Sequence, residues 1–97
     1  MKYWLHPEAQ AEHKATVVYY LAIQKNLGQR YIDEFNQTMD QICAMPQRFK
    51  IERKPDIRTA PIKKFPFDII FREHGLQIQV MAIAHKRRKP NYWNKRL

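Results

Sequence analysis

The chain has 97 residues, which is enough for one compact domain and too short for two. It carries 18 Lys and Arg against 9 Asp and Glu, and the net charge of +9 indicates an anionic partner such as nucleic acid or an acidic protein. A single cysteine excludes an intramolecular disulfide and a thiolate zinc site, and the scattered histidines predict no metal site. No apolar stretch approaches the roughly 20 residues that span a bilayer, so we expect a cytoplasmic protein with no membrane partner.

The first part of the chain predicts a short strand and a helix. Residues 3–5 have the composition of a strand, and Pro7 suits the first turn of a helix that runs to about residue 25. The unbroken apolar stretch at 17–23 indicates that this helix contacts both a second helix and a sheet. Asn26-Leu27-Gly28 is a stop signal, in which Gly28 would supply a left-handed cap.

A second helix is predicted from about Gln29 to Met45, where Pro46 ends it. An apolar stripe at helical spacing marks its buried face: Tyr31, Phe35, Thr38, Met39 and Ile42. Because the connection to the first helix is short, the two helices should form an antiparallel hairpin.

The second half of the chain predicts a sheet. Residues 47–55 form a polar, basic loop with room for a short strand, and strand-like segments follow at about 57–65, 67–73 and 76–84. Pro61 makes the first segment an edge or bulged strand, and alternate residues from Leu76 to Ala84 should share one face. The order β-α-α-β-β-β predicts a single α+β domain over residues 1–97, with the helical hairpin packed on one face of a small antiparallel sheet.

A basic, aromatic C-terminal tail, residues 85–97, follows the last strand directly. Four adjacent cations, Lys86 to Lys89, repel one another and should therefore stay in solvent. Pro90 ends the strand, and Tyr92 and Trp93 come next in a polar setting. Two interpretations of these rings remain open: they fold back to cap the core, or they contact a partner.

Four segments, in this order, resemble the RelE/ParE toxin family, whose members are often called plasmid-stabilisation proteins. His6-Pro7-Glu8-Ala9 is similar to the S-P-E-A helix start of the family, and Leu27-Gly28 precedes the helix start Arg30-Tyr31. Residues 64–71, KFPFDIIF, are similar to R-F-P-Y-x-I-x-Y. Residues 82–93, AIAHKRRKPNYW, are similar to A-x-x-H-x-R-R-x-P-x-Y-W, so the resemblance covers nearly the whole chain.

This resemblance implies the toxin of a type II toxin–antitoxin system, neutralised by a smaller antitoxin from the same operon. An antitoxin segment would pack on the helical hairpin, with Tyr20, Tyr31 and Phe35 as the expected contacts. Antitoxins of this kind are acidic where they bind, so the charge of +9 would steer the encounter. The resemblance implies no cofactor, and it leaves a homodimer and a toxin–antitoxin hetero-oligomer open.

The family contains two activities: RelE-type members cleave mRNA on the ribosome, and ParE-type members inhibit DNA gyrase. A nuclease would use these matching residues: Arg87, Tyr92 and His85. Against a nuclease, Asp68 stands where the nucleases have an arginine, and Thr59 and Pro61 stand near the positions of two lysines. We therefore expect a ParE-like gyrase inhibitor, with a ribosome-dependent mRNA endoribonuclease as the alternative and a basic nucleic-acid-binding module as the third reading.

The residues predicted to bind the target lie in the C-terminal tail: Lys86, Arg87, Arg88, Tyr92 and Trp93. This hypothesis requires the cationic end of the chain to lie outside the packed domain, where it can bind a negatively charged surface. Its cations should therefore not be neutralised by acidic residues of the same chain.

Overall fold

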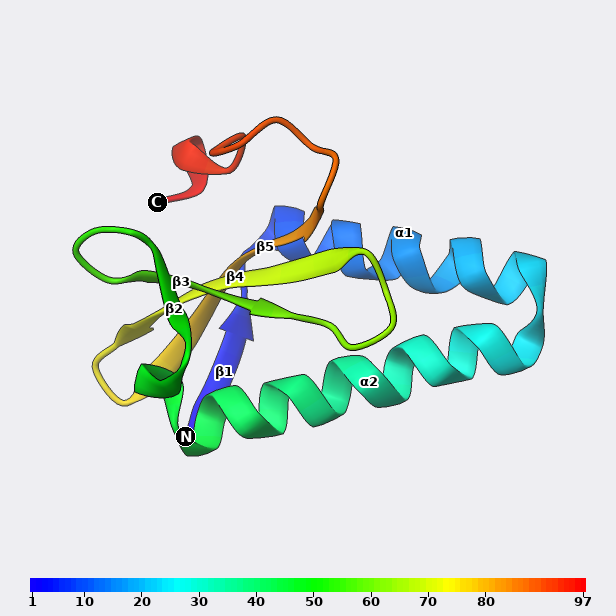
Figure 1. Ribbon diagram of the computed structural model, residues 1–97, viewed down its shortest axis with the longest axis horizontal. Coiled ribbons are helices and arrows are strands. Elements are labelled where there is room, and N and C mark those ends of the chain that lie inside the picture. The colour runs from blue at the N-terminus through cyan, green and yellow to red at the C-terminus, as the bar shows by residue number, and fades with distance from the viewer.

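The computed structural model describes residues 1–97 as two helices and a five-stranded sheet (Figure 1). The elements in chain order are β1 (Lys2–Leu5), α1 (Pro7–Ile23), α2 (Lys25–Ala44), β2 (Lys50–Arg53), β3 (Ile57–Pro61), β4 (Phe67–His74) and β5 (Gln77–His85). Short 3-10 turns lie at Pro46–Arg48 and Asn94–Arg96. The predicted α+β fold is confirmed, and β2 occupies the segment where the sequence left room for a short strand.

The sheet has the strand order β1-β5-β4-β3-β2. The pairs from β2 to β5 are antiparallel, whereas β1 pairs with β5 in parallel, Lys2 lying opposite Gln77 and Leu5 opposite Val80. The sheet is therefore mixed, and the prediction of a wholly antiparallel sheet was wrong for its first strand. Parallel pairing needs a long crossover connection, and here most of the chain separates the two strands.

The helices meet at a single residue, Gln24, and α2 begins at Lys25, earlier than predicted. Gly28 lies buried inside α2, so the prediction that it forms a left-handed cap was wrong. A Cβ atom at Gly28 would lie 2.4 Å from Cδ2 of Leu21 on α1. Glycine is present here because α1 and α2 approach closely, which a stop signal in the sequence does not reveal.

The main core lies between the two helices and one face of the sheet. The predicted stripe of α2 is confirmed, because Tyr31, Phe35, Met39 and Ile42 are each at most 2% exposed. The strands add these residues to the same cluster: Ile69, Phe71, Ile78, Val80 and Ile83.

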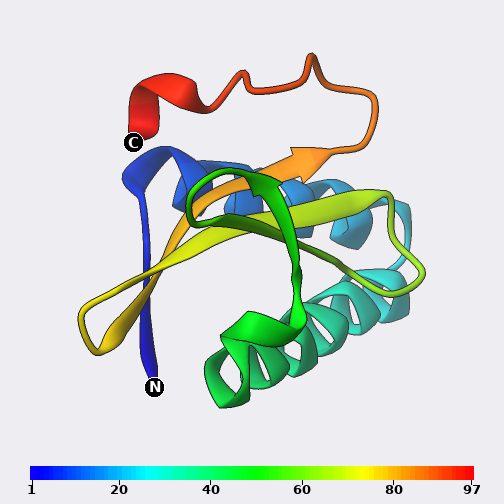
Figure 2. The same cartoon turned by 60° about the vertical axis from the view of Figure 1, so that its left-hand side comes forward.

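The opposite sheet face carries a second apolar cluster, which the C-terminal segment covers (Figure 2). The predicted alternation of β5 was wrong beyond Val80, because Met81 is an extra residue in the ladder with β4. Ile70 pairs with Ala82 and Phe71 with Val80, so Met81 has no partner opposite it. This bulge places Met81 and Ala82 together in the second cluster, beside Trp93.

The second half of α1 is only partly covered. The predicted contact of this helix with both a second helix and the sheet is confirmed, but Val18, Tyr19 and Ile23 stay 57%, 62% and 57% exposed. One side of α1 packs on α2 and β5, while the other is an apolar surface in solvent. Neither helix combines the length and the hydropathy that a membrane span requires.

Candidate functional site

The cationic turn, defined as Lys86–Lys89, follows β5 and is exposed at all four residues. Its backbone is fixed at the start, because the Lys86 N–H donates to the carbonyl oxygen of Pro66 at 2.9 Å. The His85 carbonyl accepts from the Arg88 N–H at 2.9 Å, and the Arg87 N–H donates to His85 Nδ1 at 3.0 Å. The turn therefore presents its side chains from an ordered backbone.

The charges of the turn are mostly unpaired. Lys86 Nζ lies 2.7 Å from Asp68 Oδ1, but both side chains are partly exposed, so this pair contributes little stability. Arg87, Arg88 and Lys89 form no ion pair. The requirement that these cations stay outside the domain and free of internal acids is therefore met by three of the four residues.

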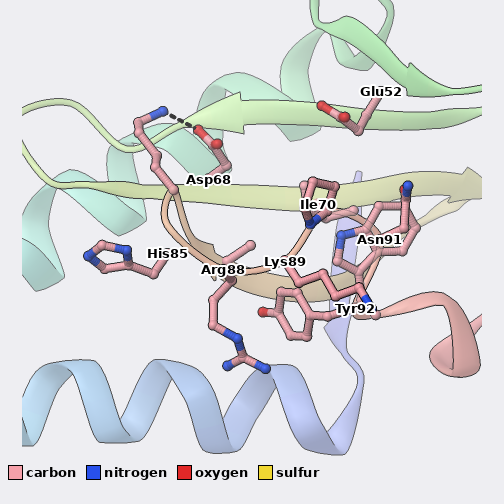
Figure 3. A pocket seen from close by; sticks show the side chains of 12 residues that line it. Glu52, Asp68, Ile70, His85, Arg88, Lys89, Asn91 and Tyr92 are labelled. Carbon is pink, nitrogen blue, oxygen red and sulfur yellow. Dashed lines mark hydrogen bonds and ion pairs between the residues drawn. The ribbon is translucent and has the colours of Figure 1, made fainter.

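A hollow of about 150 Å³ opens beside the cationic turn (Figure 3). Its walls include His85, Arg88 and Lys89 on one side and the carboxylates of Glu52 and Asp68 on the other. Both signs of charge therefore line the hollow.

The aromatic residues that follow the turn differ in exposure. Trp93 is 3% exposed and packs on Ile57 and Ile70, so it caps the outer face of the sheet and offers no surface to a target. This corrects its assignment as a target contact. Tyr92 is half-buried, and the centre of its ring lies 3.9 Å from the guanidinium carbon of Arg88.

The Tyr92 hydroxyl donates a hydrogen bond of 2.7 Å to Glu12 on α1, and Arg96 forms an ion pair of 2.8 Å with the same carboxylate. Sequence reasoning missed both Glu12 and Arg96. Glu12 and Arg96 are 84 residues apart, and no local pattern links residues at that separation. Arg96 is therefore neutralised internally, so the expectation that the cations of the tail stay free of acidic residues of the same chain was wrong for Arg96.

The residues expected of a nuclease are near one another but poorly prepared for acid–base catalysis. Burial, with the hydrogen bond to Glu12, raises the pKa of Tyr92 above its usual value, so its hydroxyl stays protonated. His85 uses Nδ1 to accept the Arg87 N–H, and its ring stands edge-on to Phe67 at 5.0 Å. No group of three His, Cys, Asp or Glu side chains could hold a metal ion.

The residues predicted to contact an antitoxin differ in their exposure. Tyr31 and Phe35 are 0% and 2% exposed and belong to the core, so they offer no surface to an antitoxin, which corrects that prediction. Tyr20 is half-buried and stacks on Tyr31, with 5.8 Å between the ring centres. Beside Tyr20 lies a mainly apolar hollow of about 410 Å³, also lined by Tyr19 and Ile23.

Comparisons with known proteins agree with this architecture. A family model described as the ParE toxin of type II toxin-antitoxin system, parDE, matches residues 3–90. Among solved structures, a chain of the chromosomal ParDE TA system from P. aeruginosa is similar, with a TM-score of 0.74 and 18% identity over 88% of this chain and 95% of that chain. At this identity the likeness concerns the fold alone. A search of curated proteins finds no match. The family match covers most of the chain, and the chain therefore belongs to the ParE toxins of type II toxin–antitoxin systems.

Proposed function

We propose that this protein arrests growth by inhibiting DNA gyrase, and that a cognate antitoxin neutralises it. The observation that carries the proposal is the cationic turn, which is exposed on an ordered backbone at the end of β5. Unpaired Arg and Lys side chains on a fixed support bind anionic groups with little loss of backbone entropy. The target surface is therefore expected to be acidic protein or nucleic acid bound by gyrase.

The nuclease alternative is less well supported by the chemistry of the same residues. Cleavage of RNA requires cations around the phosphate and a group that can take a proton. Asp68 contributes negative charge beside the turn, and Tyr92 is held protonated as a hydrogen-bond donor to Glu12. Inhibition of gyrase without bond cleavage requires neither cations around a reacting phosphate nor a group that takes a proton.

A supercoiling assay with purified gyrase tests the proposal. Wild-type protein should inhibit supercoiling, and the double change Arg87→Glu with Arg88→Glu should raise the half-inhibitory concentration at least tenfold, because it reverses two exposed charges. The matched control reverses two exposed cations far from the turn, Lys2→Glu with Arg48→Glu. Cuts in mRNA at the ribosomal A site, with no effect on gyrase, would overturn the proposal in favour of the endoribonuclease.

The antitoxin is proposed to bind the exposed apolar side of α1, with the hollow beside Tyr20 receiving one of its apolar side chains. Large apolar side chains gathered in solvent are typical of protein interfaces, and Tyr19 is 62% exposed. Tyr19→Glu with Ile23→Glu should weaken antitoxin binding in a titration calorimetry experiment. Leu76→Glu, at a residue 90% exposed in the β4–β5 turn, is the control and should leave binding unchanged. Equal effects of the two changes would contradict this assignment.

A further inference from the structure

The Glu12 carboxylate on α1 forms hydrogen bonds with β5 and with the C-terminal segment. Oε1 of Glu12 accepts hydrogen bonds from the Ile83 N–H at 3.0 Å and from Arg96 Nη1 at 2.8 Å. Oε2 accepts from the Tyr92 hydroxyl at 2.7 Å and from Arg96 Nη2 at 3.0 Å. Both oxygens are therefore used twice, and α1, β5 and the C-terminal segment meet at this residue.

The ion pair at this point is well covered. The Glu12 side chain is 19% exposed and that of Arg96 is 9% exposed, and Arg96 Nη1 also donates to the Met81 carbonyl at 3.1 Å. A covered ion pair is stabilising only where hydrogen bonds replace the lost water, as they do here. Removing one partner leaves the other charge buried without compensation, so the segment should detach rather than stay in place.

The cationic turn is connected to this point through Tyr92. The guanidinium carbon of Arg88 lies 3.9 Å from the centre of the Tyr92 ring, within the range of a cation–π contact. Figure 3 shows the Arg88 side chain extending towards α1 beside this ring. The hydroxyl of this ring donates to Glu12, so Arg88 contacts a ring that is hydrogen-bonded to α1. At its other end the turn is held by the hydrogen bond from the Lys86 N–H to the Pro66 carbonyl oxygen.

We propose that Glu12 is a positioning residue for the target-binding turn, acting through Tyr92 and Arg96. Glu12 itself touches no target. Its role is to hold the far end of the turn, so that the unpaired cations are presented in one arrangement. The proposal rests on the proposed function, because the cationic turn is taken as the surface that binds the target.

The first test is limited proteolysis of Glu12→Gln. This substitution keeps the shape of the side chain but replaces one carboxylate oxygen by an amide NH₂, which faces the donor groups of Tyr92 and Arg96. Trypsin cleavage after Arg87, Arg88, Lys95 and Arg96 should accelerate about tenfold or more, since cleavage follows the population of the detached segment. The matched control is Glu8→Gln, one turn earlier on α1, whose side chain is 67% exposed and lies 3.7 Å from Arg96 Nε. Glu8→Gln removes the same charge and should leave cleavage within about twofold of wild type.

The second test compares two affinities of the same variants. Glu12→Gln should raise the half-inhibitory concentration for gyrase about tenfold while antitoxin affinity stays within about twofold, because α1 keeps its apolar surface. Tyr92→Phe keeps the ring under Arg88 and loses only the bond to Glu12, so a smaller loss of inhibition is expected. General unfolding would weaken both affinities together, which separates positioning from a merely structural role.

Any of three results would overturn the proposal. The first is that trypsin cleaves Glu12→Gln as slowly as wild type, and the second is that Glu12→Gln and Glu8→Gln accelerate cleavage equally. The third is that Glu12→Gln weakens target binding and antitoxin binding by the same factor. Failure of the wild-type protein to inhibit gyrase would instead remove the proposed function. In that case the cleavage rates still decide whether Glu12 holds the turn.

Discussion

Replacing Trp93 with Ala should detach the C-terminal segment from the outer face of the sheet. Trp93 is 3% exposed and fills a cluster with Ile57 and Ile70 that no helix covers. Truncation of a buried Trp side chain to Ala destabilises a protein by about 3–5 kcal/mol. The total stability of a small domain is roughly 5–15 kcal/mol, so this loss is a large part of it. The thermal midpoint should fall by about 12–40 °C at the usual 4–8 °C per kcal/mol.

Urea denaturation followed by circular dichroism measures this loss directly, because the backbone signal does not depend on the tryptophan removed. Trp4→Ala is the matched control, since Trp4 is 42% exposed on the edge strand β1. The control should lose about 1 kcal/mol or less. If Trp93→Ala and Trp4→Ala lose the same small amount, the outer face of the sheet is not a stabilising part of the fold and the reasoning is refuted.

Two further predictions concern the helical hairpin. Gly28→Ala should lose about 1–3 kcal/mol in urea denaturation, because the new Cβ would lie 2.4 Å from Leu21 Cδ2. The loss should shrink in a Leu21→Ala background, and an equal loss in both backgrounds would show that helix contact is not the cause. The rings of His13 and Phe35 lie 4.0 Å apart, centre to centre, and burial lowers the pKa of His13 below 6.5 in the folded state. The unfolded chain therefore binds the proton more tightly, and the unfolding free energy should fall as the pH drops from about 7 to about 5. His13→Gln should flatten this dependence and the exposed control His74→Gln should not; an unchanged slope in His13→Gln would contradict the assignment.

Features set by neighbouring residues could be predicted from the sequence. The stripe of α2 repeats at helical spacing, and its residues Tyr31, Phe35 and Ile42 are buried as that spacing requires. The run of cations from Lys86 to Lys89 is exposed because like charges cannot be buried together without partners. In both cases the cause acts within a few residues of the chain.

Features set by contacts across the fold could not be predicted in this way. Gly28 has the composition of a helix stop, and only the position of Leu21 on the facing helix shows that it permits close packing. The bulge at Met81 depends on the register with β4, and it moves every later residue of β5 to the other face. Trp93 fits either solvent or a core by composition, and the uncovered sheet face decides between them.

The parallel pairing of the first strand with the last has a consequence for synthesis of the protein. β1 is synthesised early but has no strand to pair with until β5 has been made. Glu12 likewise cannot contact Arg96 until a further 84 residues have been added. The contacts between the first and the last elements are therefore complete only after residue 96 has been made. A chain interrupted between residues 89 and 92 would carry the cationic turn without Tyr92 or Arg96, so it would form none of the contacts that join the C-terminal segment to Glu12.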